Sequence, residues 1–468
     1  MFQGTVESLR THQIPDWFHD AKLGIMTTWG LYSVPGWAEV KGDLNEIVAK
    51  EGWKAQFFHN PYAEWYLNTM RIEGSPAQAY HRATYGENFS YDDFEPIFNL
   101  EIAKWNPAEW ADLFARAGAR YIVPVSKHCD TFVMWDTKVG TTRKATPYHA
   151  SRDTMGELAA AARAAGLKFG VYYCAGMDWV YNPHILTDFP DVFGNIPQDA
   201  EFVARCKAHW HELIDRYQPS IMWGDIGYPQ DDTLPELMAY YYNSVPDGVI
   251  NDRFAQVMKQ DDPVDDNLIL SPEPPHFDFR TPEYTSYDQI PANKWECVRG
   301  IGHSFGYNQL EGEADYASVE KLVHMLADIV SKNGNLLLGV GPMADGTIPA
   351  IQAARLIGLG AWLAVNGNAI YATRPWERAE GMTTGGLGVR FTRKGDAVYA
   401  ILLGAADGAV TIRDLRAQEG TTIHLLGDDV PLSWVQADDH LTIRLPDGLA
   451  PSAARAIAIT PAPISTAQ

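Results

Sequence analysis

A repeated order of helix and then buried strand is the sequence feature that most limits the fold of this chain. Four segments with the apolar period of a helix are each followed by a short apolar run that suits a buried strand. The pairs are 106–118 with 121–125, 153–165 with 168–174, 200–216 with 219–225, and 318–332 with 335–341. A further strand is expected at 22–30. Repeated helix–strand units build a parallel sheet, and this many units favour an α/β barrel over an open sheet.

The pattern changes near residue 372. Beyond that point, short alternating apolar runs are separated by glycine and aspartate turns, which is typical of antiparallel strands. The expected strands are 389–392, 397–402, 409–413, 421–426, 440–445 and 455–459. We therefore predict two domains, a barrel over residues 1–371 and an all-β sandwich over residues 372–468.

Composition and charge exclude several classes of partner. The formal net charge of -22 opposes binding to nucleic acid or to an anionic membrane surface, and no window has the apolar length of a membrane span. Cys129, Cys174, Cys206 and Cys297 show no metal-ligand spacing, so no metal or cofactor is expected. The first residues lack the basic region and long apolar run of a signal peptide. We therefore expect a cytoplasmic protein, and the sequence leaves open whether it forms a homo-oligomer.

Polar and aromatic side chains follow the predicted strands at the ends that meet on one face of a barrel. They are Thr28, Trp29, Lys127, His128, Cys129, Asp130, Tyr172, Tyr173, Trp223, Asp225, Arg253 and Glu283. Taken singly, each has a structural explanation: His128 as a core histidine, Arg253 as half of an ion pair, Glu283 as a loop carboxylate. Among them, Asp225 and Glu283 supply two carboxylates, Arg253 a guanidinium and His128 an imidazole amid aromatic rings, which is the set that glycoside hydrolysis requires. The aromatic-rich stretch 37–66 fits either a carbohydrate pocket or a loop packed on its own rings.

A series of short motifs runs in order through the predicted barrel. The motifs are WFHDAKLGI at 17–25, WGLYSVP at 29–35, AEWY at 63–66, SKH at 126–128, VYY at 171–173, NDR at 251–253, KWE at 294–296, FGYN at 305–308 and VSKNGNLLL at 330–338. Together they resemble the α-L-fucosidases of glycoside hydrolase family 29 over nearly the whole chain. The resemblance implies a distorted (β/α)8 TIM-like barrel followed by a C-terminal β-sandwich, and a retaining mechanism.

The resemblance also implies roles for individual residues. It places the nucleophile at Asp225 and the acid/base at Glu283. Glu296, at the end of the KWE motif, is the competing candidate for the acid/base. The residues expected to line the sugar site are Thr28, Trp29, Glu64, Trp65, His128, Cys129, Tyr172, Trp223 and Arg253. A small carbohydrate is the expected partner.

The sequence departs from the family pattern at several positions, and the resemblance assigns two of them to the sugar site. Thr28 and Cys129 stand where the family has histidines, and Gly339 stands where it has asparagine. An imidazole both donates to and accepts from a hydroxyl, so its loss leaves a sugar hydroxyl without a partner or makes room for a different one. We therefore predict an exo-acting α-L-glycoside hydrolase whose preference is shifted from L-fucose toward an α-L-glucoside or α-L-galactoside. An ordinary α-L-fucosidase and a catalytically silent sugar-binding protein are the alternatives.

Overall fold

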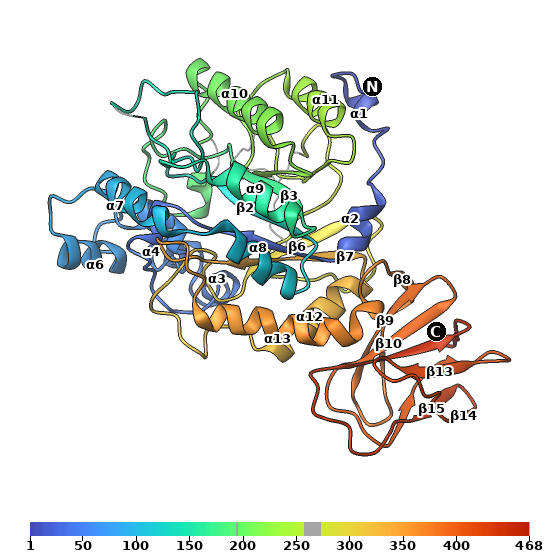
Figure 1. Cartoon of the computed structure of the whole chain (residues 1–468). Helices are drawn as coiled ribbons and strands as arrows, with labels where there is room; N and C mark the ends of the chain where they lie inside the picture. The colour runs from blue at the N-terminus through green and yellow to red at the C-terminus, as the bar shows by residue number, and fades with distance from the viewer. Residues whose placement is uncertain (146, 193–194, 257–272, 468) are drawn as a thin grey trace.

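A curled parallel sheet of seven strands lies at the centre of the protein, for which a computed structural model describes residues 1–145, 147–192, 195–256 and 273–467 (Figure 1). Its strands are β1 (Leu23–Thr27), β2 (Tyr121–Lys127), β3 (Lys168–Cys174), β4 (Ile221–Asp225), β5 (Val249–Ile250), β6 (Trp295–Gly300) and β7 (Gly334–Val340). Their order in the sheet is β5-β4-β3-β2-β1-β7-β6, and every neighbouring pair is parallel. Strands buried on both faces explain the near-continuous apolar runs in the sequence.

The segment 279–283 joins the two edges of this sheet. Asn251, just after β5, forms a parallel bridge with Phe279. On the other side, Arg280 bridges Trp295 and Glu283 bridges Val298, both on β6. The ring therefore closes as the predicted distorted barrel, with a short irregular segment at the eighth strand position. Pro282 within that segment has no N–H to give to a ladder, which contributes to the irregularity.

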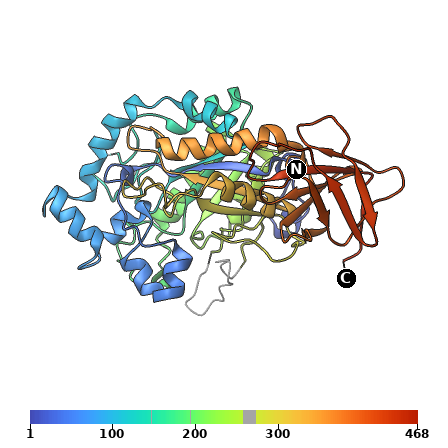
Figure 2. The same cartoon turned by 90° about the horizontal axis from the view of Figure 1, so that it is seen from below.

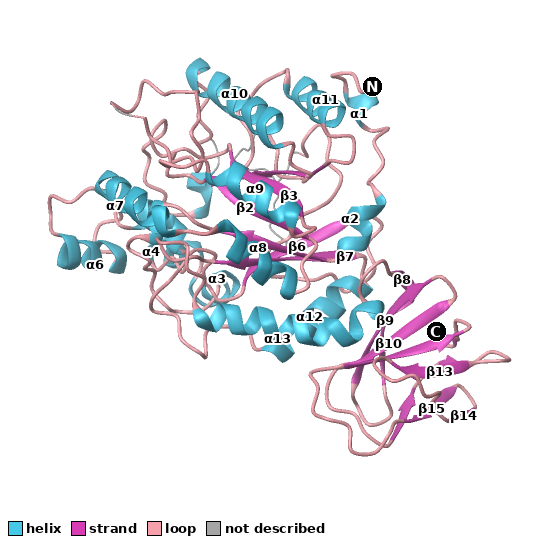
Figure 3. Ribbon diagram, in the orientation of Figure 1, coloured by secondary structure: helices cyan, strands magenta, loops and turns pink. Residues whose placement is uncertain are grey.

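Helices surround the sheet and connect its strands (Figure 3). They are α1 (Val6–Leu9), α2 (Asp16–Ala21), α3 (Leu44–Glu51), α4 (Trp53–Phe58), α5 (Tyr66–Thr69), α6 (Pro76–Tyr85), α7 (Phe94–Glu101), α8 (Pro107–Arg116), α9 (Thr154–Ala164), α10 (Ala200–Tyr217), α11 (Leu234–Ser244), α12 (Val319–Ser331) and α13 (Ala350–Asn366). The predicted signals set the ends of α8: the Asn106 side chain accepts from the Ala108 N–H, and Pro107 occupies the first turn. No helix in the described ranges has the length and apolar character needed to cross a membrane.

The remaining strands form antiparallel sheets at one end of the molecule (Figure 2). They are β8 (Arg374–Met382), β9 (Gly388–Lys394), β10 (Ala397–Leu402), β11 (Ala409–Ile412), β12 (Leu415–Arg416), β13 (Thr422–Leu425), β14 (Trp434–Ala437), β15 (His440–Arg444), β16 (Arg455–Thr460) and β17 (Ile464–Ser465). The larger sheets have the orders β13-β16-β10-β9-β8 and β11-β15-β14 and share one apolar core. The predicted strands are present, whereas β8, β12, β14 and β17 were not expected.

Charged groups connect the antiparallel sheets to the helices beside them. Asp328 on α12 accepts from Nε of Arg390 on β9 at 2.5 Å and from Nζ of Lys332 at 2.9 Å. The same lysine pairs with Glu380 on β8 at 2.6 Å. On α13, the indole N–H of Trp362 donates to the carbonyl of Ala454 at 2.8 Å. These bonds hold α12 and α13 against the sheets.

Candidate active site

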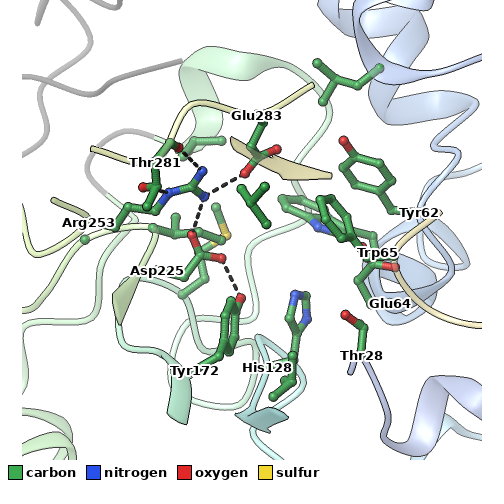
Figure 4. Close-up of a pocket in the computed structure, with 18 of the residues that line it drawn as sticks. Thr28, Tyr62, Glu64, Trp65, His128, Tyr172, Asp225, Arg253, Thr281 and Glu283 are labelled. Atoms are coloured by element: carbon green, nitrogen blue, oxygen red, sulfur yellow. Dashed lines mark hydrogen bonds and ion pairs between the residues drawn. The ribbon is translucent and has the colours of Figure 1, made fainter. Parts of the chain in front are cut away.

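A cavity opens among the carboxyl ends of the parallel strands, where barrel enzymes place their chemistry. Its volume is about 180 Å³, which is smaller than the roughly 300–1,000 Å³ of pockets for drug-sized ligands and suits a single sugar residue. The predicted site residues that line it are Thr28, Glu64, Trp65, His128, Tyr172, Trp223, Asp225, Arg253 and Glu283 (Figure 4). The sheet therefore brings together side chains that are up to 255 positions apart in the chain.

Two carboxylates in this cavity share one guanidinium nitrogen. Nη1 of Arg253 lies 2.8 Å from Oδ1 of Asp225 and 2.6 Å from Oε1 of Glu283 (Figure 4). These two carboxylate oxygens are therefore no farther apart than the two bonds laid end to end. That limit agrees with the roughly 5–5.5 Å between the carboxyl groups of retaining glycosidases and is shorter than the roughly 6.5–9.5 Å of inverting ones.

Arg253 is fixed from three further directions. Its Nε donates to the Thr281 hydroxyl at 2.9 Å, its Nη2 donates to the Thr281 carbonyl at 2.8 Å, and its guanidinium carbon lies 4.9 Å from the centre of the Trp223 ring. Burial opposes the charged form, but the carboxylates of Glu283 and Asp225 outweigh it and raise the pKa of Arg253. The guanidinium therefore stays charged between the two carboxylates.

The end of β4 positions Asp225. The Tyr172 hydroxyl, from neighbouring β3, donates to Oδ2 of Asp225 at 2.5 Å. Burial and the charge of Asp225 raise the pKa of Tyr172 well above its ordinary value, so the phenol remains a donor. Directly after Asp225, the backbone of Ile226 has φ 57°, a left-handed conformation that β-branched residues rarely adopt. The chain thus turns sharply at the strand end and leaves the carboxylate facing the cavity.

Unpaired polar atoms lie in the cavity floor. Thr28 Oγ1, Tyr62 Oη and His128 Nδ1 are buried and have no hydrogen-bond partner in the part of the chain that the structure describes. Burial, with a contribution from the neighbouring Lys127, lowers the pKa of His128 to about 4. A neutral imidazole can both donate and accept, as sugar hydroxyls require.

Glu64 supplies a third carboxyl group to the cavity wall. It lies on the single-turn 3-10 helix Ala63–Trp65, and its Oε2 accepts from the Gly306 N–H at 2.9 Å. Burial raises its pKa to about 7 against the effect of this bond. The adjacent Trp65 presents an aromatic face of the kind that stacks on sugar C–H groups (Figure 4).

Two family models match most of the chain. A family model described as alpha-L-fucosidase matches residues 1–368, and one described as the alpha-L-fucosidase C-terminal domain matches residues 383–460. The chain belongs to the α-L-fucosidase family. It is thus a glycoside hydrolase, as the motifs in the sequence predicted.

Named members of the α-L-fucosidase family resemble the chain over almost its full length. The human tissue α-L-fucosidase is 32% identical over 459 residues, which are 95% of this chain and 88% of that protein. The Thermotoga maritima α-fucosidase in complex with fucose has a TM-score of 0.86 at 41% identity, covering 98% of this chain and 100% of that chain. The Thermotoga maritima α-L-fucosynthase in complex with α-L-Fuc-(1-2)-β-L-Fuc-N3 has a TM-score of 0.88 at 42% identity and covers 98% and 99% of the two chains.

Two residues expected in the sugar site of this α-L-fucosidase family member lie outside the cavity. Trp29 packs against Phe98, Trp105 and Trp110, and its indole N–H donates to the Met343 carbonyl at 2.8 Å. Cys129 is fully buried, with its Sγ 3.5 Å from Sγ of Cys174. Their neighbours Thr28 and His128 do line the cavity.

Glu296 also lies outside the cavity lining. Its carboxylate accepts from the Tyr121 hydroxyl at 2.5 Å and from the Trp223 indole N–H at 3.0 Å. Burial raises its pKa to about 7. Glu296 therefore holds the Trp223 ring in place through this hydrogen bond. As the competing acid/base candidate, it does not line the cavity.

Other polar residues at the strand ends have structural partners. Nζ of Lys127 lies 3.1 Å from Asp178, and Asp130 accepts from the Tyr91 hydroxyl at 2.7 Å. Thr281 also lines the cavity and was not predicted, and its place two residues before Glu283 was the signal that could have revealed it. Tyr62, another lining residue, belongs to the aromatic-rich stretch 37–66, for which a carbohydrate pocket was one of the two explanations. Within the described residues, the cavity holds no group of three His, Cys, Asp or Glu side chains placed to bind a metal ion.

Proposed function

We propose that the protein is an exo-acting α-L-fucosidase that works by double displacement with retention of configuration. The observation that carries the proposal is the pair Asp225 and Glu283, bridged by one nitrogen of Arg253 in a cavity sized for one sugar. A cavity of this size supports removal of a terminal residue. The fucose complex of the 41% identical Thermotoga maritima enzyme supports the choice of sugar.

The mechanism uses the two carboxylates in turn. Asp225 attacks the anomeric carbon while Glu283 gives its proton to the departing glycosidic oxygen. Glu283 then removes a proton from water, which attacks the glycosyl–Asp225 ester and releases the sugar and the free carboxylate. Tyr172 and Arg253, both bonded to Asp225, hold the attacking oxygen in place and stabilise the carboxylate when it leaves.

The cavity wall supports a 6-deoxy sugar. Fucose carries a methyl group where L-galactose carries CH2OH, so its recognition requires an apolar surface. Met26, Val125, Val298 and Phe305 line the cavity and are buried. Such a wall stabilises the methyl and leaves a C6 hydroxyl without a partner, which disfavours the galactoside.

The predicted shift toward another L-sugar rested on Thr28 and Cys129 together. Because Cys129 lies behind the cavity, only Thr28 remains as a change in the groups that read the sugar. Its hydroxyl still offers one donor and two lone pairs where the family has an imidazole. A single change, to a side chain that still offers a donor and an acceptor, supports the ordinary fucosidase activity better than altered specificity.

A panel of 4-nitrophenyl glycosides tests the proposal. We expect kcat/KM for the α-L-fucoside to exceed that for the α-L-galactoside by roughly tenfold or more, with the α-L-glucoside and α-L-rhamnoside lower still. Proton NMR of the first-formed fucose should show the α anomer, as retention requires. A galactoside or glucoside that reacts as well as the fucoside overturns the sugar assignment, and no turnover of any member overturns the proposed activity.

A further inference from the structure

A second cluster of polar residues lies near the amino terminus, away from the catalytic cavity. His12 follows α1, which runs beside α11 (Figure 1). His276 and Asp278 come from the segment that leads into the eighth strand position. The exposed fractions of the three side chains are 5%, 7% and 2%. Residues 264 positions apart thus bury two imidazoles and one carboxylate together.

Three potential ligand atoms converge in this cluster. Nδ1 of His12 lies 2.8 Å from Oδ1 of Asp278, and Nε2 of His276 lies 3.7 Å from the same oxygen. All three atoms lie within 4.8 Å of one another. Since zinc binds imidazole nitrogen and carboxylate oxygen at roughly 2.0–2.2 Å, shifts of a few tenths of an ångström bring all three atoms into one coordination shell.

We propose that His12, His276 and Asp278 form a binding site for a divalent transition-metal ion, for which Zn²⁺ is the probe. Two neutral imidazoles and one carboxylate are the ligands that zinc takes in open three-residue sites, where water completes the shell. On binding, the metal takes the place of the hydrogen bonds that Nδ1 of His12 makes with Asp278 and Nε2 of His276 makes with Tyr242, and each neutral imidazole keeps its one proton on its other ring nitrogen.

Groups around the cluster suit a coordination shell. The Tyr242 hydroxyl lies 2.7 Å from both Nε2 of His276 and Oδ2 of Asp278, and the Ile250 N–H donates to the same carboxylate oxygen at 2.8 Å. The bonds to Oδ2 orient the Asp278 carboxylate, as outer bonds do for metal ligands, whereas a bound metal would replace the contact of Tyr242 with Nε2 of His276. Beside the cluster lies a cavity of about 360 Å³, lined in part by Arg10, which has room for metal-bound water. Arg10 is exposed to solvent, so water screens its charge from the ion.

The site connects the amino-terminal segment to the strand that carries Glu283. Asp278 immediately precedes Phe279, the first residue of the segment that closes the barrel. A bound ion would join this point to His12 and thereby fix the start of the closing segment. The role assigned to the ion is structural, and it does not depend on the proposed sugar specificity.

Zinc binding to the full-length protein tests the proposal. Protein treated with a chelator and dialysed should bind one equivalent of Zn²⁺ per chain, as measured by calorimetry and by elemental analysis. His12→Gln keeps an N–H that can donate to Asp278 but removes the imidazole, so it should weaken the zinc affinity at least roughly tenfold. Zn²⁺ should also raise the Tm of the wild type more than that of His12→Gln.

Two further variants separate this site from adventitious binding. His184 is exposed on the surface, and His184→Ala should leave affinity and stoichiometry unchanged. His12→Ala should behave as His12→Gln does, and circular dichroism reports whether each variant is folded. If the wild type binds no zinc, or if His12→Gln binds it as tightly as the wild type does, the cluster is a hydrogen-bonded network only and the proposal is wrong. These readouts require no enzymatic activity, so they stand apart from the test of the proposed function.

Discussion

Asp225 has two partners in the folded protein, and removal of its carboxylate leaves both of them with other contacts. Arg253 keeps Glu283 and Thr281, while Tyr172 remains packed on Trp223 with ring centres 5.3 Å apart. We therefore expect Asp225→Gly to fold and to lose fucoside hydrolysis by roughly 10⁴-fold. Added azide should fill the vacated space and give a glycosyl azide of β configuration, detectable by NMR. Hydrolysis near the wild-type rate would show that Asp225 is not the nucleophile.

The loss of rate on removing the Glu283 carboxyl group should depend on the acidity of the leaving group. A phenol that is already acidic leaves without a proton, whereas a sugar or alkyl leaving group needs one. We expect Glu283→Ala to slow natural fucosides by roughly 10²–10⁴-fold and activated aryl fucosides much less in the first step. Azide should then accelerate turnover and give an α-configured azide. Equal losses on both substrates without an azide effect would point to a different acid.

The protonation of Glu296 should make the free energy of unfolding depend on pH. Burial raises its pKa from 4.5 to about 7 in the folded state, so its contribution is fully present below pH 4.5 and is lost as the pH rises through 7. The loss amounts to at most about 3 kcal/mol for a shift of this size. Glu296→Gln cannot ionise, so urea unfolding at pH 5 and pH 8 should show a smaller drop in stability than in the wild type. Glu64, whose pKa is raised similarly, is present in both proteins and cancels in the comparison. If the wild type and Glu296→Gln lose the same free energy of unfolding between pH 5 and pH 8, the expectation is wrong.

At the scale of elements, the turns that follow β3 and β4 lie against each other behind Asp225. A Cβ added to Gly176 would lie 1.6 Å from the carbonyl oxygen of Ile226, and a backbone clash of this kind is not relieved by rotating a side chain. Gly176→Ala must therefore move the turn that carries Asp225. A displacement of about 1 Å in a catalytic group lowers the rate by roughly 10²-fold.

Gly140 provides the matched control for this expectation. A Cβ there meets nothing within 4 Å, so Gly140→Ala should keep the wild-type kcat/KM. Steady-state kinetics on an aryl fucoside, with circular dichroism to confirm folding, compares the two variants. Equal activity of Gly176→Ala and Gly140→Ala would mean that the turn adjusts without moving Asp225.

The strands with strong apolar patterns were predictable, and the irregular element was not. The apolar run 219–225 predicts β4, because a strand buried on both faces is apolar over most of its length. Asp225 is the charged residue at the end of this run. The closing segment 279–283 has no such pattern, since it pairs through isolated bridges and contains Pro282. Sequence motifs nevertheless placed Glu283 in the cavity.

Side-chain direction was the part of the site that sequence could not supply. Thr28 and Trp29 are neighbours in the sequence, yet one faces the cavity and the other the helices outside it. Which of two neighbours faces inward depends on the register of the strand, and a shift of one residue reverses it. Similarly, the sequence indicated that Glu296 lies near the face that carries the cavity. It did not indicate that the side chain bonds Trp223 and lies outside the cavity lining.

At the scale of the whole molecule, Asp328 is one of the carboxylates that join the helices of the barrel to the antiparallel sheets. Asp328→Ala removes one acceptor of Arg390 and Lys332 and leaves them Glu380 as a remaining shared carboxylate. We expect the free energy of unfolding to fall by about 1–3 kcal/mol, measured by thermal and urea denaturation. Glu419→Ala, at an exposed position in the turn between β12 and β13, should change it by less than about 0.5 kcal/mol. Equal stability of the two variants would show that the contact contributes nothing to docking.

The closure of the barrel places the two catalytic candidates on opposite sides of a seam. Asp225 belongs to the run of strands that ends at β5, and Glu283 to the segment paired with β6. Arg253 bonds both carboxylates, so it connects the two sides of the seam and also places a positive charge between them. Any loosening of the seam would widen the gap between the carboxylates while the core stays intact. The proposed retaining mechanism works only across a narrow gap between the carboxylates. The turnover rate should therefore depend on how tightly the segment 279–283 stays paired with its neighbours on both sides.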